Sequence, residues 1–193
     1  MGTKTDFSVV VDIGTSKMAA FAGRKNQDNK IEILGMAKVP SHGIKRGMVL
    51  NIDEAAAAVT QLVEELEKQM DEEISSITIA YAGQPMRLNT FKSERLTSGE
   101  GMVTQADVDE LLKEAQSIQV EAGFKILHIL PQSYIVDGEV ADHSPAGVTG
   151  HKVEAVFKIV SVPEIYLTNF HRVIEKAGMT LDDIILAPIA TGE

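Results

Sequence analysis

The sequence contains no cysteine and no tryptophan, and three tyrosines and six phenylalanines are its only aromatic residues. Without cysteine, a disulfide framework and a thiolate metal site are both excluded, and a reducing cytoplasm is compatible with the chain. No stretch approaches the roughly 18 to 20 consecutive apolar residues that a membrane-spanning helix requires. The segment before Asp12 has one lysine and a short apolar run that turns acidic, unlike a secretory signal. We therefore expect no membrane anchor within these residues.

Basic residues are also few, since 18 Lys and Arg stand against 28 Asp and Glu, which gives a formal net charge of −10. A chain of this charge repels phosphate backbones and anionic surfaces on average, so nucleic acid is not expected as a partner. The 193 residues are 44% hydrophobic. This length and composition predict one or two compact globular units.

The first half of the sequence predicts three antiparallel strands, a helix and a fourth strand. Short apolar or alternating runs at 8–11, 18–23 and 31–40 are typical of strands joined by turns. A fourth strand is predicted in SSITIAYAG, which ends at Gly83. Between them, apolar residues recur at helical spacing on one face of a helix that starts after Asn51: Ile52, Ala56, Val59, Leu62, Val63, Leu66 and Met70.

The next residues, 86–162, predict a smaller β-α-β-β unit inserted into the first. MRLNTFKSERLTS alternates like a partly exposed hairpin, and Thr104 with Asp107 resembles a capping box before a helix. Two strands follow, in KILHILPQSYIVDGE and HKVEAVFKIVSV. The fold class predicted for the whole is therefore α/β, with a mixed sheet.

After the insertion, Ser161 and Glu164 predict a second capping box with Pro163 in the first helical turn, and the helix ends at Gly178. One more strand and the start of another helix are predicted in LDDIILAPIATGE. Because the sequence stops as an element begins, we expect it to be the N-terminal fragment of a longer protein.

The segment VVVDIGTSK carries the most informative chemistry. A buried strand enters a tight turn at Gly14, which aims backbone N–H groups and the hydroxyls of Thr15 and Ser16 at phosphate oxygens. Each hydrogen bond to an ionised acceptor contributes about 1.5–3 kcal/mol. Asp12 could hold Mg²⁺ directly or through water, and Lys17 could face either phosphate or solvent. Taken alone, the motif also fits a plain β-hairpin with a polar turn.

Other signatures of catalysis or nucleotide binding are absent from the sequence. There is no G-x-x-x-x-G-K-[ST] and no G-x-G-x-x-G after a strand, which excludes P-loop and Rossmann sites. There is also no H-E-x-x-H and no G-x-S-x-G, so zinc chemistry and acyl transfer have no support.

Six segments together resemble the FtsA family of bacterial cell-division proteins, in order and spacing, over nearly the whole chain from about Ser8: VVVDIGTSK, SHGIKRGMVLNID, SSITIAYAG, GMVTQADVDELL, ILHILPQSYIVDGE and PAGVTGHKVEAVFKIVS. The resemblance implies an actin-like ATPase fold. Residues 7–83 and 163–193 would form a ribonuclease H-like subdomain 1A, and 84–162 would form the inserted subdomain 1C.

The resemblance also implies a site and a cofactor. The family's first phosphate motif falls on Asp12, Gly14, Thr15, Ser16 and Lys17, with ATP as ligand and Mg²⁺ at Asp12. No catalytic residue is assigned. The second phosphate motif, the adenosine motif, the FtsZ-binding subdomain and a C-terminal membrane helix would lie beyond Glu193. We expect at most weak ATPase activity in the complete protein and weak or no ATP binding by this fragment.

The partners implied by the resemblance are FtsZ, further copies of the same protein in a filament, and later division proteins. The last two would bind through 84–162, where KSERLTS and VEAVFKIV could offer an unpaired strand edge. The location implied is the cytoplasm, at the inner membrane of the division site, where the protein would link FtsZ to the membrane.

Three alternatives stay open at this point. A sugar-kinase-type phosphotransferase shares the phosphate turn, but would leave SHGIKRGMVLNID unexplained. A PilM-like pilus-assembly protein shares the turn and a similar insert, although LPQSYIVDG favours FtsA. The third alternative is an interaction module with an idle nucleotide site.

Overall fold

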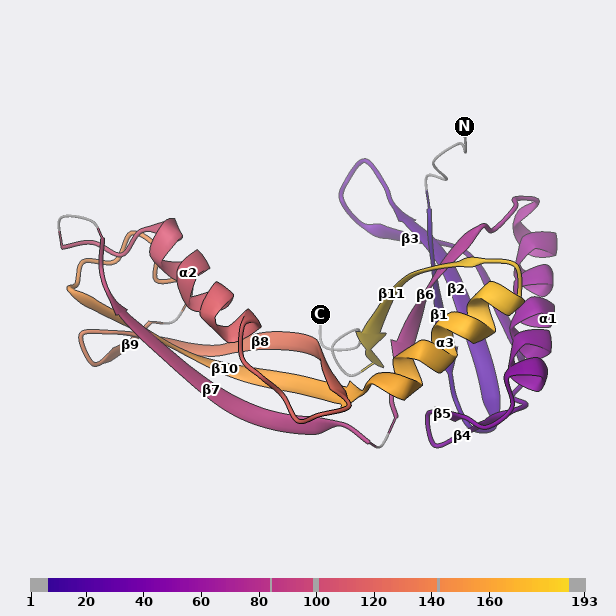
Figure 1. The fold of residues 1–193 in the computed structure, drawn as a ribbon. Helices are drawn as coiled ribbons and strands as arrows, with labels where there is room; N and C mark the ends of the chain where they lie inside the picture. The colour runs from indigo at the N-terminus through magenta and orange to yellow at the C-terminus, as the bar shows by residue number, and fades with distance from the viewer. Residues whose placement is uncertain (1–6, 84, 99–100, 142, 188–193) are drawn as a thin grey trace. The chain divides into compact units, whose positions relative to one another are not determined.

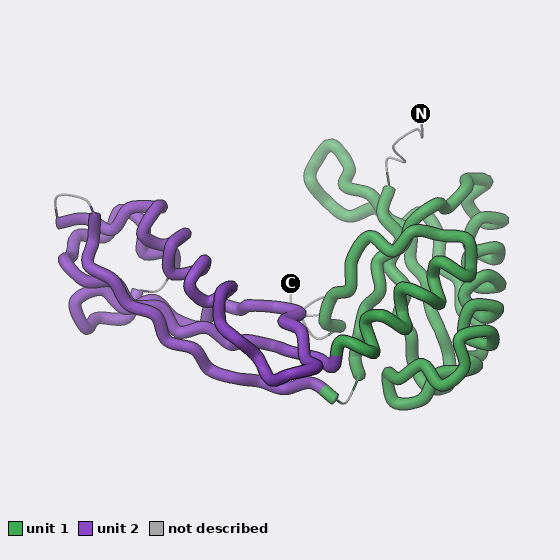
Figure 2. The backbone as a smooth tube through the Cα atoms, viewed as in Figure 1, with its two compact units in different colours: residues 1–85, 164–193 green, residues 86–163 purple. Residues whose placement is uncertain are grey.

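The structure is a computed structural model that describes residues 7–83, 85–98, 101–141 and 143–187. It divides the chain into two compact units, shown in Figure 2. Unit 1 comprises residues 1–85 and 164–193, and unit 2 comprises residues 86–163. Unit 2 is thus inserted into the sequence of unit 1.

Unit 1 is built on a five-stranded mixed sheet (Figure 1). In the order β11-β6-β1-β2-β3, its strands are β11 Thr180–Leu186, β6 Ser76–Tyr81, β1 Ser8–Ile13, β2 Lys17–Lys25 and β3 Ile31–Pro40. The first three strands of the sequence pair in antiparallel fashion, while β6 is parallel to β1 and β11 is parallel to β6. The mixed α/β sheet predicted from the sequence is confirmed.

Two helices, α1 Ile52–Met70 and α3 Glu164–Lys176, pack against this sheet and against each other. The strand residues in register with Val11 point toward the helices and are buried. On the opposite face Phe21 and Met36 lie side by side and are 41% and 57% exposed, so the described residues cover only one face fully. Of the helical stripe predicted for α1, Ala56, Val59, Leu62, Val63 and Leu66 are buried, whereas Ile52 and Met70 are half-buried. Ala55 and Ala58, which were not part of that prediction, are also buried.

Local sequence explains where these helices begin and end. The side chain of Asn51 accepts hydrogen bonds from the backbone N–H groups of Asp53 and Glu54 and so caps α1. Gly178, with φ +81°, follows the end of α3, as predicted. No helix within the described residues is long and apolar enough to cross a membrane.

A short hairpin precedes α1 and was not predicted. Its strands are β4 Ile44–Lys45 and β5 Met48–Val49, which pair Ile44 with Val49. The two residues between them have positive φ, +52° at Arg46 and +75° at Gly47. Both values are those of a type I′ turn, which matches the twist of the flanking strands.

Unit 2 is a four-stranded sheet with one helix (Figure 1). In chain order its elements are β7 Arg87–Leu96, α2 Gln105–Gln116, β8 Phe124–Val136, β9 Glu139–Ala141 and β10 Lys152–Pro163, and the sheet order is β7-β10-β8-β9. The predicted β-α-β-β order is confirmed, with β9 as a short addition. Its core lies between α2 and the sheet: Val103, Val108, Leu111, Ala115, Val136, Val153, Ala155, Phe157 and Ile159.

Asp107, in the first turn of α2, fixes that helix to the end of β7. The side chain of Thr104 accepts from the Asp107 N–H, and the Asp107 carboxylate accepts from the Thr104 N–H at 2.9 Å, so the predicted capping box is confirmed. The carboxylate also accepts from the N–H and hydroxyl of Ser98, at 3.2 and 2.8 Å. These bonds, above all that from the Thr104 backbone, lower the pKa of Asp107 to about 2 although the side chain is buried.

Two predictions were wrong. Residues 87–96 form one strand rather than a hairpin, because β7 pairs along its whole length with β10, from Arg87 opposite Ser161 onward. The second capping box does not form: Ser161 is buried inside β10, Pro163 ends that strand, and α3 begins at Glu164. The helix predicted after β11 falls largely on residues 188–193, outside the described residues.

Candidate functional site

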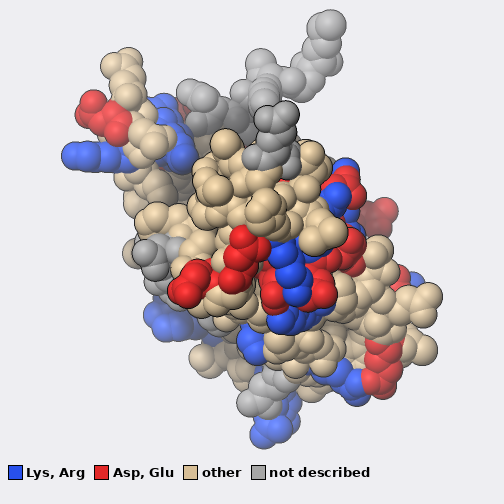
Figure 3. Space-filling view, turned by 90° about the vertical axis from the view of Figure 1, so that its left-hand side faces the viewer, with Lys and Arg blue, Asp and Glu red and all other residues tan. Residues whose placement is uncertain are grey.

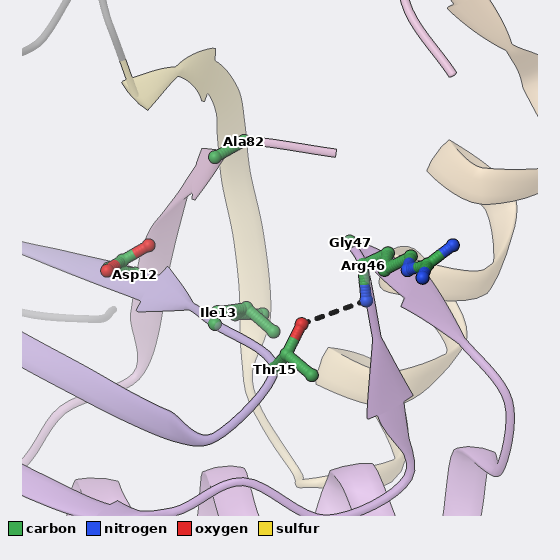
Figure 4. Close-up of a pocket in the computed structure, with 7 residues that line it drawn as sticks. Asp12, Ile13, Thr15, Arg46, Gly47 and Ala82 are labelled. Carbon is green, nitrogen blue, oxygen red and sulfur yellow. Dashed lines mark hydrogen bonds between the residues drawn. The ribbon is translucent and has the colours of Figure 1, made fainter. Parts of the chain in front are cut away.

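The candidate site lies in unit 1, where two parallel strands end. β1 and β6 run in the same direction, so their carboxyl ends meet at one edge of the sheet, which is where α/β folds place ligands. A hollow of about 310 Å³ opens there (Figure 4). Its lining comes from the turn after β1, the tip of the β4–β5 hairpin and the residue after β6: Asp12, Ile13, Gly14, Thr15, Arg46, Gly47 and Ala82.

The turn after β1 is closed by its own backbone. The N–H of Gly14 donates to the carbonyl oxygen of Lys17 at 3.1 Å. A Cβ atom at position 14 would lie 2.7 Å from that oxygen, so the turn in this form requires glycine. This agrees with the sequence-based expectation of a tight turn at Gly14.

A second contact ties the turn to the hairpin. The backbone N–H of Arg46 donates to Oγ1 of Thr15 at 2.9 Å, as Figure 4 shows. The hairpin tip is also packed onto the end of β6, because a Cβ at Gly47 would lie 2.2 Å from Cα of Gly83. Three segments that are distant in sequence are therefore held together around the hollow.

Asp12 lines the hollow from the end of β1, one residue before Ile13, where that strand ends. Its backbone lies between Ala19 of β2 and Ala80 of β6, and its side chain is exposed. In Figure 4 the carboxylate of Asp12 and the guanidinium of Arg46 lie on opposite sides of Thr15. Among the described residues there is no group of three His, Asp or Glu side chains placed to hold a metal. A Mg²⁺ ion at Asp12 would keep most of its ligands as water or phosphate, which Mg²⁺ commonly does.

The other two residues of the predicted motif lie outside the hollow. The carbonyl oxygen of Ser16 accepts from the N–H of Ser41 at 3.1 Å, and Lys17 is exposed at the start of β2 opposite Pro40. The structure thus brings Asp12, Gly14 and Thr15 together around the hollow. The phosphate-binding role of all five residues stays a prediction.

The sequence analysis missed the contribution of Arg46 and Gly47. SHGIKRGMVLNID was used only as a mark of resemblance, with no structural role. The one signal was Gly47 between two short apolar segments, since glycine is typical of the second position of a two-residue hairpin turn; an arginine before it is not, so the signal was too weak to predict the hairpin.

Tyr81, the last residue of β6, is 1% exposed. Its ring packs edge-to-face on Phe170 of α3, with 5.8 Å between ring centroids. Burial, and to a lesser degree the nearby Tyr166, raises the pKa of Tyr81 to about 12, so the phenol stays neutral at physiological pH. The end of β6 is therefore held by packing without adding charge beside the hollow.

Unit 2 carries a different kind of surface. On the sheet face that α2 leaves open, Lys92 pairs with Glu154, and Lys152 lies 2.8 Å from Glu94 and 3.1 Å from Glu154. Figure 3 shows acidic and basic side chains interleaved on the face it displays. On the open sheet face of unit 2, these described pairs alternate in sign and so do not form an area of one sign that would steer a highly charged partner.

Only one of the two strand segments predicted as an edge of unit 2 lies at an edge. β10, which contains VEAVFKIV, has β7 on one side and β8 on the other, so that part of the prediction was wrong. β7, which contains KSER, pairs within the described residues only with β10 and forms the outer strand. Unpaired N–H and C=O groups of an outer strand are the groups to which a further strand adds.

Comparison with known proteins gives a consistent result. Residues 83–161 match the model of the SHS2 domain inserted in FtsA. The cell division protein FtsA of Neisseria meningitidis serogroup B is 36% identical over 185 residues, which are 95% of this chain and 44% of that protein. FtsA of Escherichia coli K12 is 28% identical over 189 residues, 97% of this chain and 45% of that protein. The chain thus spans less than half the length of these relatives.

Among solved structures, a chain of the PilM-PilN type IV pilus biogenesis complex matches with a TM-score of 0.60. It is 14% identical, and the match covers 97% of this chain and 49% of that one. A likeness at this identity shows a shared fold and carries nothing about partners or activity.

Proposed function

Because this chain belongs to the FtsA family of bacterial cell-division proteins, with the actin-like fold and the SHS2 insert, we propose that it supplies one wall of an ATP site together with an interaction domain. The residues that line the hollow of unit 1 would form this wall, and unit 2 would be the interaction domain. The rest of the site would come from the residues that the FtsA relatives have beyond the matched region. ATP would be bound rather than rapidly turned over.

The observation that carries the nucleotide proposal is the convergence of Asp12, Gly14 and Thr15 on one hollow at the ends of parallel strands. Oγ1 of Thr15 already accepts the Arg46 N–H, so its own proton is available to donate to a phosphate oxygen. An ionised Asp12 would repel phosphate but would attract Mg²⁺, directly or through water. These two groups would receive the two components of a magnesium–phosphate pair.

We further propose that unit 2 contacts other proteins of the division site through the outer edge of β7. Copies of the same protein in a filament and later division proteins are the expected partners, whereas FtsZ and the membrane would be contacted by residues outside this chain. The place of action would be the cytoplasmic face of the inner membrane at the division site. Membership of the FtsA family and the exposed edge strand support this assignment.

The nucleotide proposal is tested by Asp12→Ala in a longer protein that contains this chain and the remaining domains. ATP affinity, measured by calorimetry with and without Mg²⁺, should lose its Mg²⁺ dependence and fall at least about tenfold, which is about 1.4 kcal/mol. Asp28→Ala removes the same charge from an exposed position in the β2–β3 turn and should change nothing. Equal Mg²⁺-dependent affinity in the Asp12 variant and the unchanged protein would contradict the proposal.

The 193-residue chain is a second test of the same site. If one wall alone is present, ATP binding should be weak or absent, because affinity requires the opposing contacts. A micromolar dissociation constant for this chain would show that its own residues suffice, and would contradict the expectation of a shared site.

A further inference from the structure

The β4–β5 hairpin carries the strongest unexplained feature of the hollow. Arg46 has φ +52°, in the left-handed region that side-chain-bearing residues rarely adopt, and it is followed by Gly47 at +75°. Asn, Asp and Gly are the residues favoured at the first of these turn positions, not Arg. Backbone strain of this kind persists where the surroundings hold it in place, and it gathers at ligand sites.

The surroundings hold this turn at both ends. At the base, the carbonyl oxygen of Gly43 accepts from the N–H groups of Leu50 and Asn51, at 2.8 and 3.1 Å. At the tip, the Arg46 N–H is bonded to Thr15 and Gly47 is packed onto Gly83. The tip position is therefore fixed relative to the turn after β1, and the side chain of Arg46 starts at a defined place on the rim.

The charges of the lining give the hairpin a chemical role. Of the seven residues that line the hollow, Asp12 and Arg46 are the two that carry charge. The Arg46 side chain is exposed and forms no ion pair within the described part of the chain. Lys17, which the motif offered as a cation, lies outside the lining. Among the described residues that line the hollow, Arg46 is therefore the cation placed to meet a phosphate group.

We propose, building on the nucleotide site above, that Arg46 is a phosphate-binding residue whose guanidinium neutralises the phosphate oxygens while Asp12 takes the metal. The Arg46 backbone serves the same site, since its N–H orients Thr15 as a donor. An arginine fork matches the oxygens of a phosphate in two parallel hydrogen bonds. In Figure 4 the Arg46 N–H is directed at Thr15 while the side chain extends from the other side of the backbone, so binding a phosphate requires this exposed, flexible side chain to turn toward the hollow.

The test is Arg46→Gly in the longer protein that contains this chain and the remaining domains, because glycine adopts the left-handed turn without strain and removes only the side chain. Lys45→Ala is the matched control, since it removes the same charge from the same hairpin at a position outside the lining. Binding of magnesium tripolyphosphate, and of magnesium ATP, is measured by titration while ¹⁵N–¹H spectra report the Gly14, Thr15 and Gly47 amides. Thermal unfolding of each variant is measured in parallel.

We expect Arg46→Gly to weaken binding of both ligands at least about tenfold, about 1.4 kcal/mol, while its unfolding temperature stays equal or rises. Arg46→Lys should restore part of the binding, and Lys45→Ala should bind as the unchanged protein does. A purely structural role would instead lower the unfolding temperature and leave the affinity of the folded protein unchanged.

Three outcomes would overturn the inference, and they differ in what else they would refute. Equal binding by Arg46→Gly and the unchanged protein would refute the role of Arg46 and leave the nucleotide site standing. Amide shifts absent in the longer protein with Arg46 unchanged, up to the solubility limit of tripolyphosphate, would refute phosphate binding at this hollow altogether. An effect of Arg46→Gly on ATP but not on tripolyphosphate would refute contact with the phosphates.

Discussion

Replacing Asp107 by asparagine should destabilise unit 2 strongly, because five neighbouring groups depend on its negative charge. One carboxylate oxygen accepts from the N–H and hydroxyl of Ser98 and the other from those of Thr104, with Nε of Arg95 3.5 Å away. An amide in this position turns its NH₂ group toward one of these donor pairs. Asp107 is 1% exposed, so water cannot replace the lost bonds.

The magnitude follows from two contributions. The pKa of Asp107 falls from 3.8 to about 2 on folding, which corresponds to about 2 kcal/mol of stability at neutral pH. An unsatisfied buried donor costs about 1–3 kcal/mol, and this overlaps with the first figure because the same Ser98 and Thr104 bonds lower the pKa. We therefore expect Asp107→Asn to lower the free energy of unfolding of unit 2 by about 2–3 kcal/mol at pH 7.

The sign of the pH dependence is fixed by the lowered pKa. A carboxylate with a depressed pKa stabilises the fold above its unfolded pKa, and that stability is lost as the pH falls through its folded pKa. Most of the ionic contribution of Asp107 should therefore disappear between about pH 4 and pH 2. Asp107→Asn should lack this decline, so the two stability curves should converge in that window.

The assay is urea unfolding at a series of pH values. Because the chain has no tryptophan, ¹⁵N–¹H spectra of the buried Leu111 and Phe157 report the unfolding of unit 2. Asp109→Asn is the matched control, an exposed acid two residues along the same helix, and should change stability by less than about 0.5 kcal/mol. A difference between Asp107→Asn and the unchanged chain that is below this value, or that is the same at pH 7 and pH 2, would refute the reasoning.

Two further predictions concern α1 and are read from the unfolding of unit 1 in urea. Asn51→Ala removes the oxygen that accepts from the first N–H groups of the helix and should cost about 1 kcal/mol, whereas Asn51→Asp should keep the cap; equal losses in both would contradict the capping role. Leu62→Ala leaves a cavity at a fully buried position and should lower the free energy of unfolding by about 2–5 kcal/mol. Gln61→Ala, on the exposed side of the helix, should be nearly neutral. Similar losses of stability at both positions would contradict the burial of that helix face.

Elements with a clear period could be predicted from the sequence. The alternation of β1 to β3 and the apolar stripe of α1 gave these elements within one or two residues at most ends, and the Thr104–Asp107 cap could be predicted because its partners are three residues apart. The β4 and β5 strands could not, since two residues show no period. Alternation also could not decide between one strand and a hairpin at 87–96, because the partner that decides it, β10, lies some sixty residues away.

The same distinction between local and distant partners applies to the site. Asp12, Gly14 and Thr15 are close together in the sequence, so their spacing alone predicted that they lie near one another. In the structure they line the same hollow. Arg46 reaches that hollow from 31 positions downstream of Thr15, through a hairpin whose tip position is set by tertiary packing. Pro163 shows a related failure: its restricted φ suits both the first helical turn and the end of a strand, and its pairing with Phe124 of β8 decides for the strand.

The insertion of unit 2 also links the stabilities of the two units. β6 and β11 pair directly, yet the whole of residues 86–163 separates β6 from α3. Within unit 2, Arg87 at the start of β7 lies opposite Ser161 near the end of β10, so the folded insert returns the chain close to its point of departure. When the insert is unfolded, the β6–β11 pairing must close a long flexible loop, whose entropic cost grows with its length. Unit 2 thus acts as a cross-link whose strength depends on its own folding, and any change that melts it should weaken the sheet at whose edge the hollow lies.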